Sequence, residues 1–570
     1  MSEMPDALIR KYLPLGTDHF DGTSKGERPP AEPFKGNHVE ALVDAVAYFG
    51  ALDDEIAALK AGRGPGRYFY LSAWWLGLVG HTGAVAVESF GAKAGEIAKR
   101  FGVQPRWSLT VEAEQFVLPK SGRALLYELC ELAMKGVDVR VLAWTSPFLP
   151  KYKPVADKVP GVAALNLHTI LSVDALRSAP AMRDAVMLNM LAHPMGAAHL
   201  KTVVCGDQTS MRAYTGGLDP HMSRFASVDE PGGWHDVAAR VQGPAAAAIH
   251  DFFRQLWNEQ RRRPTQTFRV AGKEIPSQTK GVKEIPAREP TPAPAGAEHL
   301  VQVLRTVPRM NFSSSGPTHF PGGALQRWLV TNLSGFRTPA LSFAPDGVFE
   351  FKAALEKAIS SAERYIFIAD QAFQSQEVMD WINTRKAARP DLKIILVYGP
   401  DPADTPTGLF HQAINKHLLR GPDQPTGIAI HQWAEVTAHC KVTIVDDRWC
   451  AIGSANCMRR SLYTDIELSI GVLDTGNASF VRTLRRDLWA RYCGLSLHAE
   501  TQPARTHGAE LDALQDLDKA LGVWDPDWGT PPEGISLRPT LQRLPLPVPE
   551  TIPYTEEVRD LADPDSRERL

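Results

Sequence analysis

Two short segments of the chain carry the same pair of reactive side chains, a histidine followed two positions later by a lysine. The pairs are His199 with Lys201 and His439 with Lys441. Alternate residues of a strand face the same side, so each histidine projects beside its lysine. Imidazole is a nucleophile at neutral pH, and lysine stabilises the negative charge that builds on phosphate oxygens. A second histidine is needed to protonate the leaving group and then to activate water. We therefore predict that both segments build one phosphoryl-transfer site.

The residues that follow His439 support this chemistry most completely. The strand that begins there is expected to turn at Asp446 and to return toward the sequence GSAN. Ser454 and Asn456 of that sequence end near the histidine–lysine face, where they can donate hydrogen bonds to a phosphate. Glu467 lies on the next strand, and we expect its carboxylate to accept the second ring N–H of His439 and to fix its tautomer.

The spacing HxKxxxxD, followed by GSxN and a downstream glutamate, resembles the signature of the phospholipase D superfamily. The first half of the chain is similar to the N-terminal motif of plant-type phospholipases D. There a His-x-Lys strand leads to Gly-Gly-Leu-Asp, here ending at Asp219, and then to Trp-His-Asp, here ending at Asp236. Two departures stand out. The hairpin acid Asp207 comes one position late, and Ala73 replaces an acid that the family has before two tryptophans.

The resemblance implies a role for each of these residues. His199 is the nucleophile that carries the covalent phosphatidyl group, and His439 is the general acid and base. The residues expected to bind the substrate phosphate are Lys201, Lys441, Asn456, Asp219 and Ser454. Those expected to support them from behind are Glu467, Asp236, Asp446 and Asp207, although an acid at a hairpin tip is normally turn chemistry. No group of residues has metal-ligand spacing, so we expect no metal and no cofactor.

Helical periodicity alternates with short β-branched runs in both halves, which indicates an α/β fold. The resemblance implies two tandem phospholipase D-type lobes, each a mixed β-sheet flanked by helices, packed face to face around one active site. The segments we predict are an N-terminal extension (1–64), lobe 1 (65–265), a Pro-rich linker (266–300), lobe 2 (301–498) and a Pro-rich C-terminal extension (499–570).

Composition narrows the function. The chain has 570 residues, 44% of them hydrophobic, and a net charge of −3, which gives no reason to expect a nucleic-acid partner. We see no signal peptide and no apolar run long enough to span a membrane. We therefore expect a monomer that meets dispersed phospholipid or a bilayer surface from the water side. The location we expect is cytoplasmic or peripheral to a membrane, and secretion without a signal is compatible with the sequence.

The function favoured by the sequence is hydrolysis of glycerophospholipids to phosphatidic acid and a free head group, or exchange of that head group. Three alternatives remain open. They are a cardiolipin synthase-like phosphatidyltransferase, a phospholipase effector toxin and a nuclease of the same superfamily. The intact histidines, lysines and Asn or Asp residues in both halves argue against an inactive scaffold that keeps the fold for binding.

Overall fold

The computed structural model describes most of the chain. The described residues are 5–14, 32–89, 107–145, 160–192, 196–225, 233–308, 339–399, 414–419, 426–434, 436–475, 479–495, 508–530 and 534–548. Helices and strands alternate through both halves, so the α/β prediction is confirmed. Within the described residues, no helix is both long and apolar enough to cross a bilayer.

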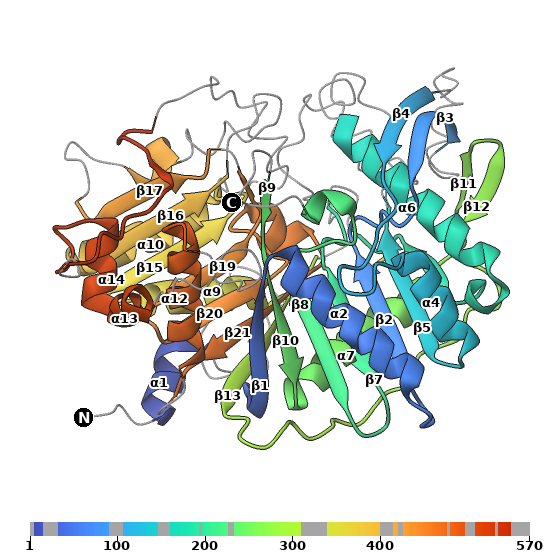
Figure 1. Cartoon of the computed structure of the whole chain (residues 1–570), viewed down its shortest axis with the longest axis horizontal. Coiled ribbons are helices and arrows are strands. Elements are labelled where there is room, and N and C mark those ends of the chain that lie inside the picture. The colour runs from blue at the N-terminus through green and yellow to red at the C-terminus, as the bar shows by residue number, and fades with distance from the viewer. Residues whose placement is uncertain are drawn as a thin grey trace.

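The first half is a seven-stranded mixed sheet with helices on both faces (Figure 1). Its strands are β1 (Phe34–Val43), β2 (Tyr68–Ala73), β5 (Asp138–Trp144), β6 (Val186–Asn189), β7 (Thr202–Gly206), β8 (Met211–Gly216) and β10 (Val237–Gln242). Its helices are α2 (Asp44–Ala61), α4 (Leu125–Met134), α6 (Pro160–Ser178) and α7 (Pro244–Arg262). A separate four-stranded sheet is made by β3 (His81–Ser89), β4 (Trp107–Ala113), β11 (Thr267–Val270) and β12 (Lys273–Pro276).

The second half repeats this plan. Its main strands are β13 (His299–Val307), β15 (Tyr365–Asp370), β16 (Lys393–Tyr398), β17 (Ile428–Gln432), β19 (Lys441–Val445), β20 (Trp449–Gly453) and β21 (Glu467–Leu473). Its helices are α9 (Glu350–Ser361), α10 (Gln376–Ala388), α12 (Phe480–Tyr492), α13 (Gly508–Gln515) and α14 (Leu517–Trp524), and α1 (Pro5–Tyr12) packs on α9. Short elements complete the half: β14 (Val348–Phe349), β18 (Val436–Ala438), β22 (Gln542–Arg543) and the π-helical turns Ile414–Leu418 and Arg460–Thr464.

Strand order shows that the halves are copies of one unit. The first half runs β6-β5-β2-β7-β8-β10-β1, and the second runs β17-β16-β15-β19-β20-β21-β13. In each, the three strands at one end are parallel and the rest are antiparallel. A closing helix follows the β10 and β21 strands in both halves, namely α7 and α12. The two halves therefore share one strand order and one arrangement of parallel and antiparallel strands.

The junction between the halves differs from the expected packing of two separate sheets face to face. β1 and β13 pair antiparallel, so hydrogen bonds join both halves into one continuous sheet. The physical reason is that each strand would otherwise present an unpaired edge of N–H and C=O groups. The pairing is irregular between Phe34 and Asn37. β8 also approaches β21, where Thr215 Oγ1 donates to Leu468 O at 2.9 Å.

Three apolar clusters form the core of the molecule. The outer face of the first half packs α2, α4 and α6 against its sheet, and the outer face of the second half packs α9 and α10 in the same way. The third cluster lies between the halves and contains residues of α7, α12 and both sheets. Successive strand residues such as Tyr68 and Phe69 enter different clusters, because side chains alternate across a sheet.

Element boundaries differ from the segments expected at the two ends of lobe 1. Residues 34–61, which we assigned to an N-terminal extension, form β1 and α2, and β1 pairs with β10 over six residues from His38 to Val43. Part of the expected linker forms the hairpin of β11 and β12. Both segments contain alternating apolar residues that find a partner strand only in the folded chain.

Candidate active site

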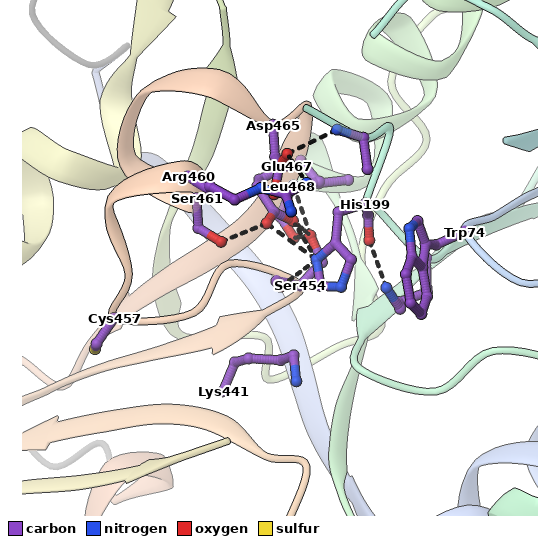
Figure 2. Close-up of polar contacts among 12 residues, drawn as sticks. Trp74, His199, Lys441, Ser454, Cys457, Arg460, Ser461, Asp465, Glu467 and Leu468 are labelled. Atoms are coloured by element: carbon purple, nitrogen blue, oxygen red, sulfur yellow. Dashed lines mark hydrogen bonds and ion pairs between the residues drawn. The ribbon is translucent and has the colours of Figure 1, made fainter. Parts of the chain in front are cut away.

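His199 precedes β7 and lies against a carboxylate of the other half (Figure 2). Its Nδ1 is 3.0 Å from Glu467 Oε1 and 3.1 Å from Ser454 O. Both partners are acceptors, so Nδ1 carries the proton and Nε2 keeps a lone pair. That is the tautomer a nucleophilic imidazole needs.

Two hydroxyl groups hold the Glu467 carboxylate in place. Ser454 Oγ donates to Oε2, and Ser461 Oγ donates to Oε1 at 2.7 Å. Glu467 is fully buried, so these bonds and the one from His199 replace the water that the carboxylate lost. Ser454 therefore acts on the glutamate, and the expectation that its hydroxyl binds the phosphate is wrong because that hydroxyl is already committed.

The second histidine has the reciprocal arrangement. His439 Nδ1 is 2.6 Å from Asp236 Oδ2, and Asp236 belongs to the first half. Asp236 Oδ1 accepts from the backbone N–H of Val237 at 2.8 Å. His439 is 3% exposed. Each histidine is therefore oriented by an acid of the opposite half.

This crossed pattern follows from the backbone. His199 N donates to Ile466 O, which precedes Glu467, at 2.9 Å. His439 N donates to His235 O, which precedes Asp236, at 2.8 Å. The segment bearing each histidine thus pairs with the segment bearing the other half's acid.

The expected partnership of Glu467 with His439 is therefore corrected. The prediction considered one half alone, in which the strand of Glu467 is a near neighbour of the strand of His439 in sequence. Pairing between halves offers Glu467 a different histidine, and no local sequence signal reports that pairing.

The two lysines lie beside their own histidines, as the spacing predicted. Lys201 Nζ donates to His199 O at 2.6 Å, and Lys441 Nζ donates to His439 O at 2.5 Å. Figure 2 shows the ammonium end of Lys441 directed toward the His199 side of the site. Each ammonium group has three N–H donors, so each retains capacity for an oxygen anion.

Asn456 and Asp219 occupy equivalent places but differ in their bonding. The side-chain oxygen of Asn456 is buried without a hydrogen-bond partner among the described residues. Because amide oxygen and nitrogen are interchangeable by rotation, this group can present an N–H to a phosphate. Asp219 instead accepts hydrogen bonds from the backbone N–H groups of Trp74 and Trp75, both at 2.9 Å. A carboxylate repels phosphate, so the structure does not support Asp219 as a phosphate ligand.

Parts of the chain are similar to known cardiolipin synthases. Residues 355–490 match the family described as "Cardiolipin synthase, PLD-like domain". A cardiolipin synthase A of Pectobacterium carotovorum is 22% identical over 64% of this chain and 60% of its own length. A cardiolipin synthase B of Salmonella typhi is 26% identical over 23% of this chain and 30% of its own length. The chain thus spans less than two thirds of the length of these relatives.

The family match covers the segment that bears His439, Lys441 and Asn456. The chain belongs to the phospholipase D superfamily. Among solved structures, the phosphatidylserine synthase of Haemophilus influenzae is similar to this superfamily member at a TM-score of 0.39 and 11% identity, covering 78% of this chain and 84% of that one.

The hairpin acids of this phospholipase D superfamily chain lie away from the histidines. Asp446 accepts hydrogen bonds from Tyr12 and from the backbone N–H groups of residues 363–365, at 2.7–2.9 Å. Asp207 accepts from Thr209 and Ser210 in its own turn. Each sits at the far end of a strand of about five residues, which spans roughly 17 Å. Both acids therefore have the structural role in a turn that hairpin chemistry favoured, and the alternative expectation that they support the histidines is wrong.

Burial governs the protonation of both dyads. It lowers the pKa of His199 well below its ordinary value, and Lys201 lowers it further. It lowers the pKa of His439 in the same direction, with Lys441 as the next cause. Both imidazoles are therefore neutral in the empty site. An arriving phosphate anion favours the protonated form, which is the state a general acid requires.

The supporting groups titrate near neutrality. Burial raises the pKa of Glu467 to about 7 and that of Asp236 to about 6. Burial also lowers the pKa of Lys201 to about 8, against the opposing attraction of Asp219. The site therefore holds ionisable groups whose charges change within a narrow range around pH 7.

Several residues of the site were missed by the sequence reasoning. Trp74 lies edge-on to His199 with ring centroids 5.2 Å apart, and its face is 5.0 Å from Lys201 Nζ. Trp234 lies 4.8 Å from His439 by ring centroid. Asp370 pairs with Lys441 and could have been found by aligning the two halves of the chain, because it stands where the first half has Ala73.

A buried polar cluster backs the His439 segment and was also missed. His235 Nδ1 is 2.7 Å from Asp44 Oδ1, and its Nε2 is 3.1 Å from the Tyr492 hydroxyl. Arg491 donates to the other oxygen of Asp44 at 3.1 Å. These bonds hold His235, the residue before Asp236, in place. No periodic or spacing signal in the sequence distinguishes these residues from ordinary surface groups.

Proposed function

We propose that this chain is a phosphatidyltransferase that moves the phosphatidyl group of a glycerophospholipid to an alcohol through a covalent phosphohistidine. The crossed dyads carry the proposal, since they give two imidazoles the same tautomer on either side of one site. The names of the similar proteins, cardiolipin synthases, favour transfer over the hydrolysis that the sequence favoured. Transfer and hydrolysis share every step except the identity of the acceptor.

The first half-reaction uses both histidines. Nε2 of neutral His199 attacks phosphorus, and the bond from phosphorus to the head-group oxygen breaks. Protonated His439 donates its proton to the departing oxygen. Lys201, Lys441 and Asn456 stabilise the charge on the non-bridging oxygens. The products are a phosphohistidine and a free head group.

The second half-reaction reverses these roles. His439, now neutral, takes the proton of an incoming hydroxyl group. The hydroxyl oxygen attacks phosphorus, the nitrogen–phosphorus bond breaks, and His199 is regenerated with its lone pair. An alcohol gives a new phosphodiester, whereas water gives phosphatidic acid.

The setting of the reaction follows from the substrate class. We propose that the chain meets phospholipid at a bilayer surface or as dispersed lipid, without a metal or cofactor, and acts as a monomer. In the described residues, no group of histidine, cysteine and carboxylate side chains could hold a metal ion. An effector toxin would use the same chemistry, and a nuclease would require DNA in place of lipid.

The test is to incubate the protein with vesicles of phosphatidylglycerol, phosphatidylcholine or phosphatidylethanolamine, with and without glycerol or ethanol. We expect phosphatidyl-alcohol whenever alcohol is present, and diphosphatidylglycerol from phosphatidylglycerol alone. Phosphatidic acid as the main product at saturating alcohol would show that the protein is a hydrolase and would contradict the proposed transferase activity. Cleavage of DNA but not of lipid would contradict both, and His199→Ala is the control for adventitious activity.

A further inference from the structure

Each lysine of the site lies beside a buried carboxylate, but the two carboxylates come from different positions of the repeat. Lys201 Nζ is 3.6 Å from Asp219 Oδ2, and Asp219 is fully buried. Asp370 is 2% exposed and pairs with Lys441 across two strands. Burial raises the pKa of Asp370 to about 6, and Lys441 lowers it. Lys441 is also attracted by Asp236, and more strongly than by Asp370. Asp370 has no role in the chemistry described above.

Strand register shows that these two acids are not equivalent in position. In the second half, Asp370 pairs with Lys441 at the end of β15. In the first half, Ser72 pairs with Thr202, so the next residue, Ala73, is level with Lys201. Ala73 is therefore the counterpart of Asp370.

The turn after the hairpin shows the opposite exchange. Thr215 pairs with Thr202, and Ile452 pairs with Val442, which makes Thr215 and Ile452 equivalent. Four residues further on stand Asp219 in the first half and Asn456 in the second. Each half thus has one acid and one uncharged residue at these two positions, in opposite order.

Both acids join the same two loops, from opposite sides. Asp219 lies in the turn and accepts hydrogen bonds from Trp74 N and Trp75 N, which follow β2. Asp370 ends β15 and accepts from Cys457 N, in the turn, at 2.8 Å. Its other oxygen accepts from Ala372 N at 2.6 Å. The connection between strand end and turn is kept although the residue that makes it has moved.

We infer that Asp219 and Asp370 are positioning residues with the same function, although they stand at different positions of the repeat. Each joins the strand-end loop to the turn and balances the charge of its half's lysine. The acid can be supplied from either position, and one half uses the turn while the other uses the strand end. This inference rests on the proposed function only in its consequence for catalysis. Its structural content concerns the lysines and can be measured without a substrate.

The experiment compares Asp219→Asn with the double variant Ala73→Asp/Asp219→Asn. Asparagine keeps an oxygen for the two backbone N–H groups but removes the charge. The double variant returns a carboxylate to the position that the second half uses. The measurement is the thermal unfolding midpoint between pH 6 and pH 9, with kcat and KM in the lipid assay as a second readout.

The expected pH dependence has a definite sign. The charged groups acting on Lys201 are Asp219, Glu467, Lys441 and Arg224. The pKa of Lys201 is about 8, below its ordinary value because of burial, so it is charged at pH 6 and mostly neutral at pH 9. Removing the acid lowers that pKa further and leaves a buried ammonium unbalanced. The midpoint of Asp219→Asn should therefore fall clearly at pH 6 and little at pH 9, and the double variant should recover most of the loss.

A matched control is Asp53→Asn. Asp53 is also buried and accepts two backbone N–H groups, those of Lys120 and Ser121, but it lies outside the site. A loss from loop joining alone should be the same at pH 6 and pH 9, and this control should show that behaviour. An equal loss for Asp219→Asn at both values of pH, or no loss, would overturn the role in charge balance.

Catalysis adds a separate readout. We expect Asp219→Asn to lower kcat by about tenfold or more with a smaller change in KM, because a misplaced lysine stabilises the transition state less. Adding Ala73→Asp should restore kcat. Recovery of stability without any lipid activity in the unmodified protein would disprove the proposed function and leave this inference standing. A folded double variant that recovers neither property would disprove the equivalence of the two positions.

A corresponding pair of variants in the second half keeps the inference testable if the first double variant fails to fold. The charged groups acting on Lys441 include Asp236, Asp370 and Glu467. Asp370→Ala should lower the unfolding midpoint at a pH where Lys441 is charged, and Asp370→Ala/Asn456→Asp should recover it. This pair is scored on stability alone, since Asn456→Asp also removes an amide from the site. Absence of recovery in this pair would contradict the inference as well.

Discussion

The two halves of the molecule have the same strand order but different active-site chemistry at equivalent positions. The first half offers His199 with an acid in its turn, and the second offers His439 with an amide in its turn and an acid at its strand end. In addition, Glu467 of the second half contacts His199, and Asp236 of the first half contacts His439. Under the proposed mechanism, two halves with the same strand order divide the roles of nucleophile, proton donor and counter-charge between them. The following predictions test that division.

Removal of either histidine should have the largest effect on kcat. A substrate whose leaving group needs no proton should distinguish the nucleophile from the general acid. We expect His199→Ala and His439→Ala each to lower kcat with a natural phospholipid by on the order of a thousandfold or more. A phosphatidyl ester of 4-nitrophenol needs no proton on its leaving group. His439→Ala should therefore still release a burst of nitrophenol, and His199→Ala should not. The opposite result would assign attack to His439.

The crossed dyads predict which acid acts with which histidine. Glu467→Gln should resemble His199→Ala and lose the nitrophenol burst, because the imidazole loses its orienting carboxylate. Asp236→Asn should resemble His439→Ala and keep the burst. Each should cost roughly a hundredfold or more in kcat with a natural substrate. Stopped-flow absorbance would measure this, and exchanged phenotypes would show that each acid acts within its own half.

The pH dependence of kcat/KM should be a narrow bell with its maximum between about 7 and 8. Below the pKa of Glu467, about 7, its carboxylate takes up a proton and cannot support a charged imidazole. Above the pKa of Lys201, about 8, that lysine loses the charge that binds phosphate. Activity therefore falls on both sides. A plateau that extends below pH 6 or above pH 9.5 would contradict these assignments.

The hairpin acids should affect stability and leave catalysis unchanged. Asp446→Ala removes four hydrogen bonds that tie Tyr12 and residues 363–365 to the turn. We expect it to lower the free energy of unfolding by about 2 kcal/mol. Asp207→Ala, confined to its own exposed turn, should lower it by less than about 1 kcal/mol. Denaturant unfolding and kcat on the same samples would check this, and a large loss of kcat would return either acid to the site.

The sequence alone predicted much of the reacting centre. A histidine and a lysine two apart in an extended segment face the same side. His199, Lys201 and His439 lie just before β7 and β19, and the pairing of each histidine with its lysine still follows from the spacing alone. The repeat and the α/β class also follow from periodicity. The failures concern partners: Ser454 and Asp219 were expected to bind the phosphate, and Glu467 was expected to orient His439. Spacing does not report which acceptor or donor a side chain has already found.

Tertiary structure decided what lies opposite each histidine. Glu467 and Asp236 are separated by more than two hundred residues from the histidines they orient, and only the pairing of His199 N with Ile466 O and of His439 N with His235 O brings them together. The same holds for the acid beside each lysine, which comes from the turn in the first half and from the strand end in the second. Local sequence fixes the direction of a side chain on its own strand. Contacts between strands of different halves depend on burial and register across the whole sheet, so only the folded chain determines them.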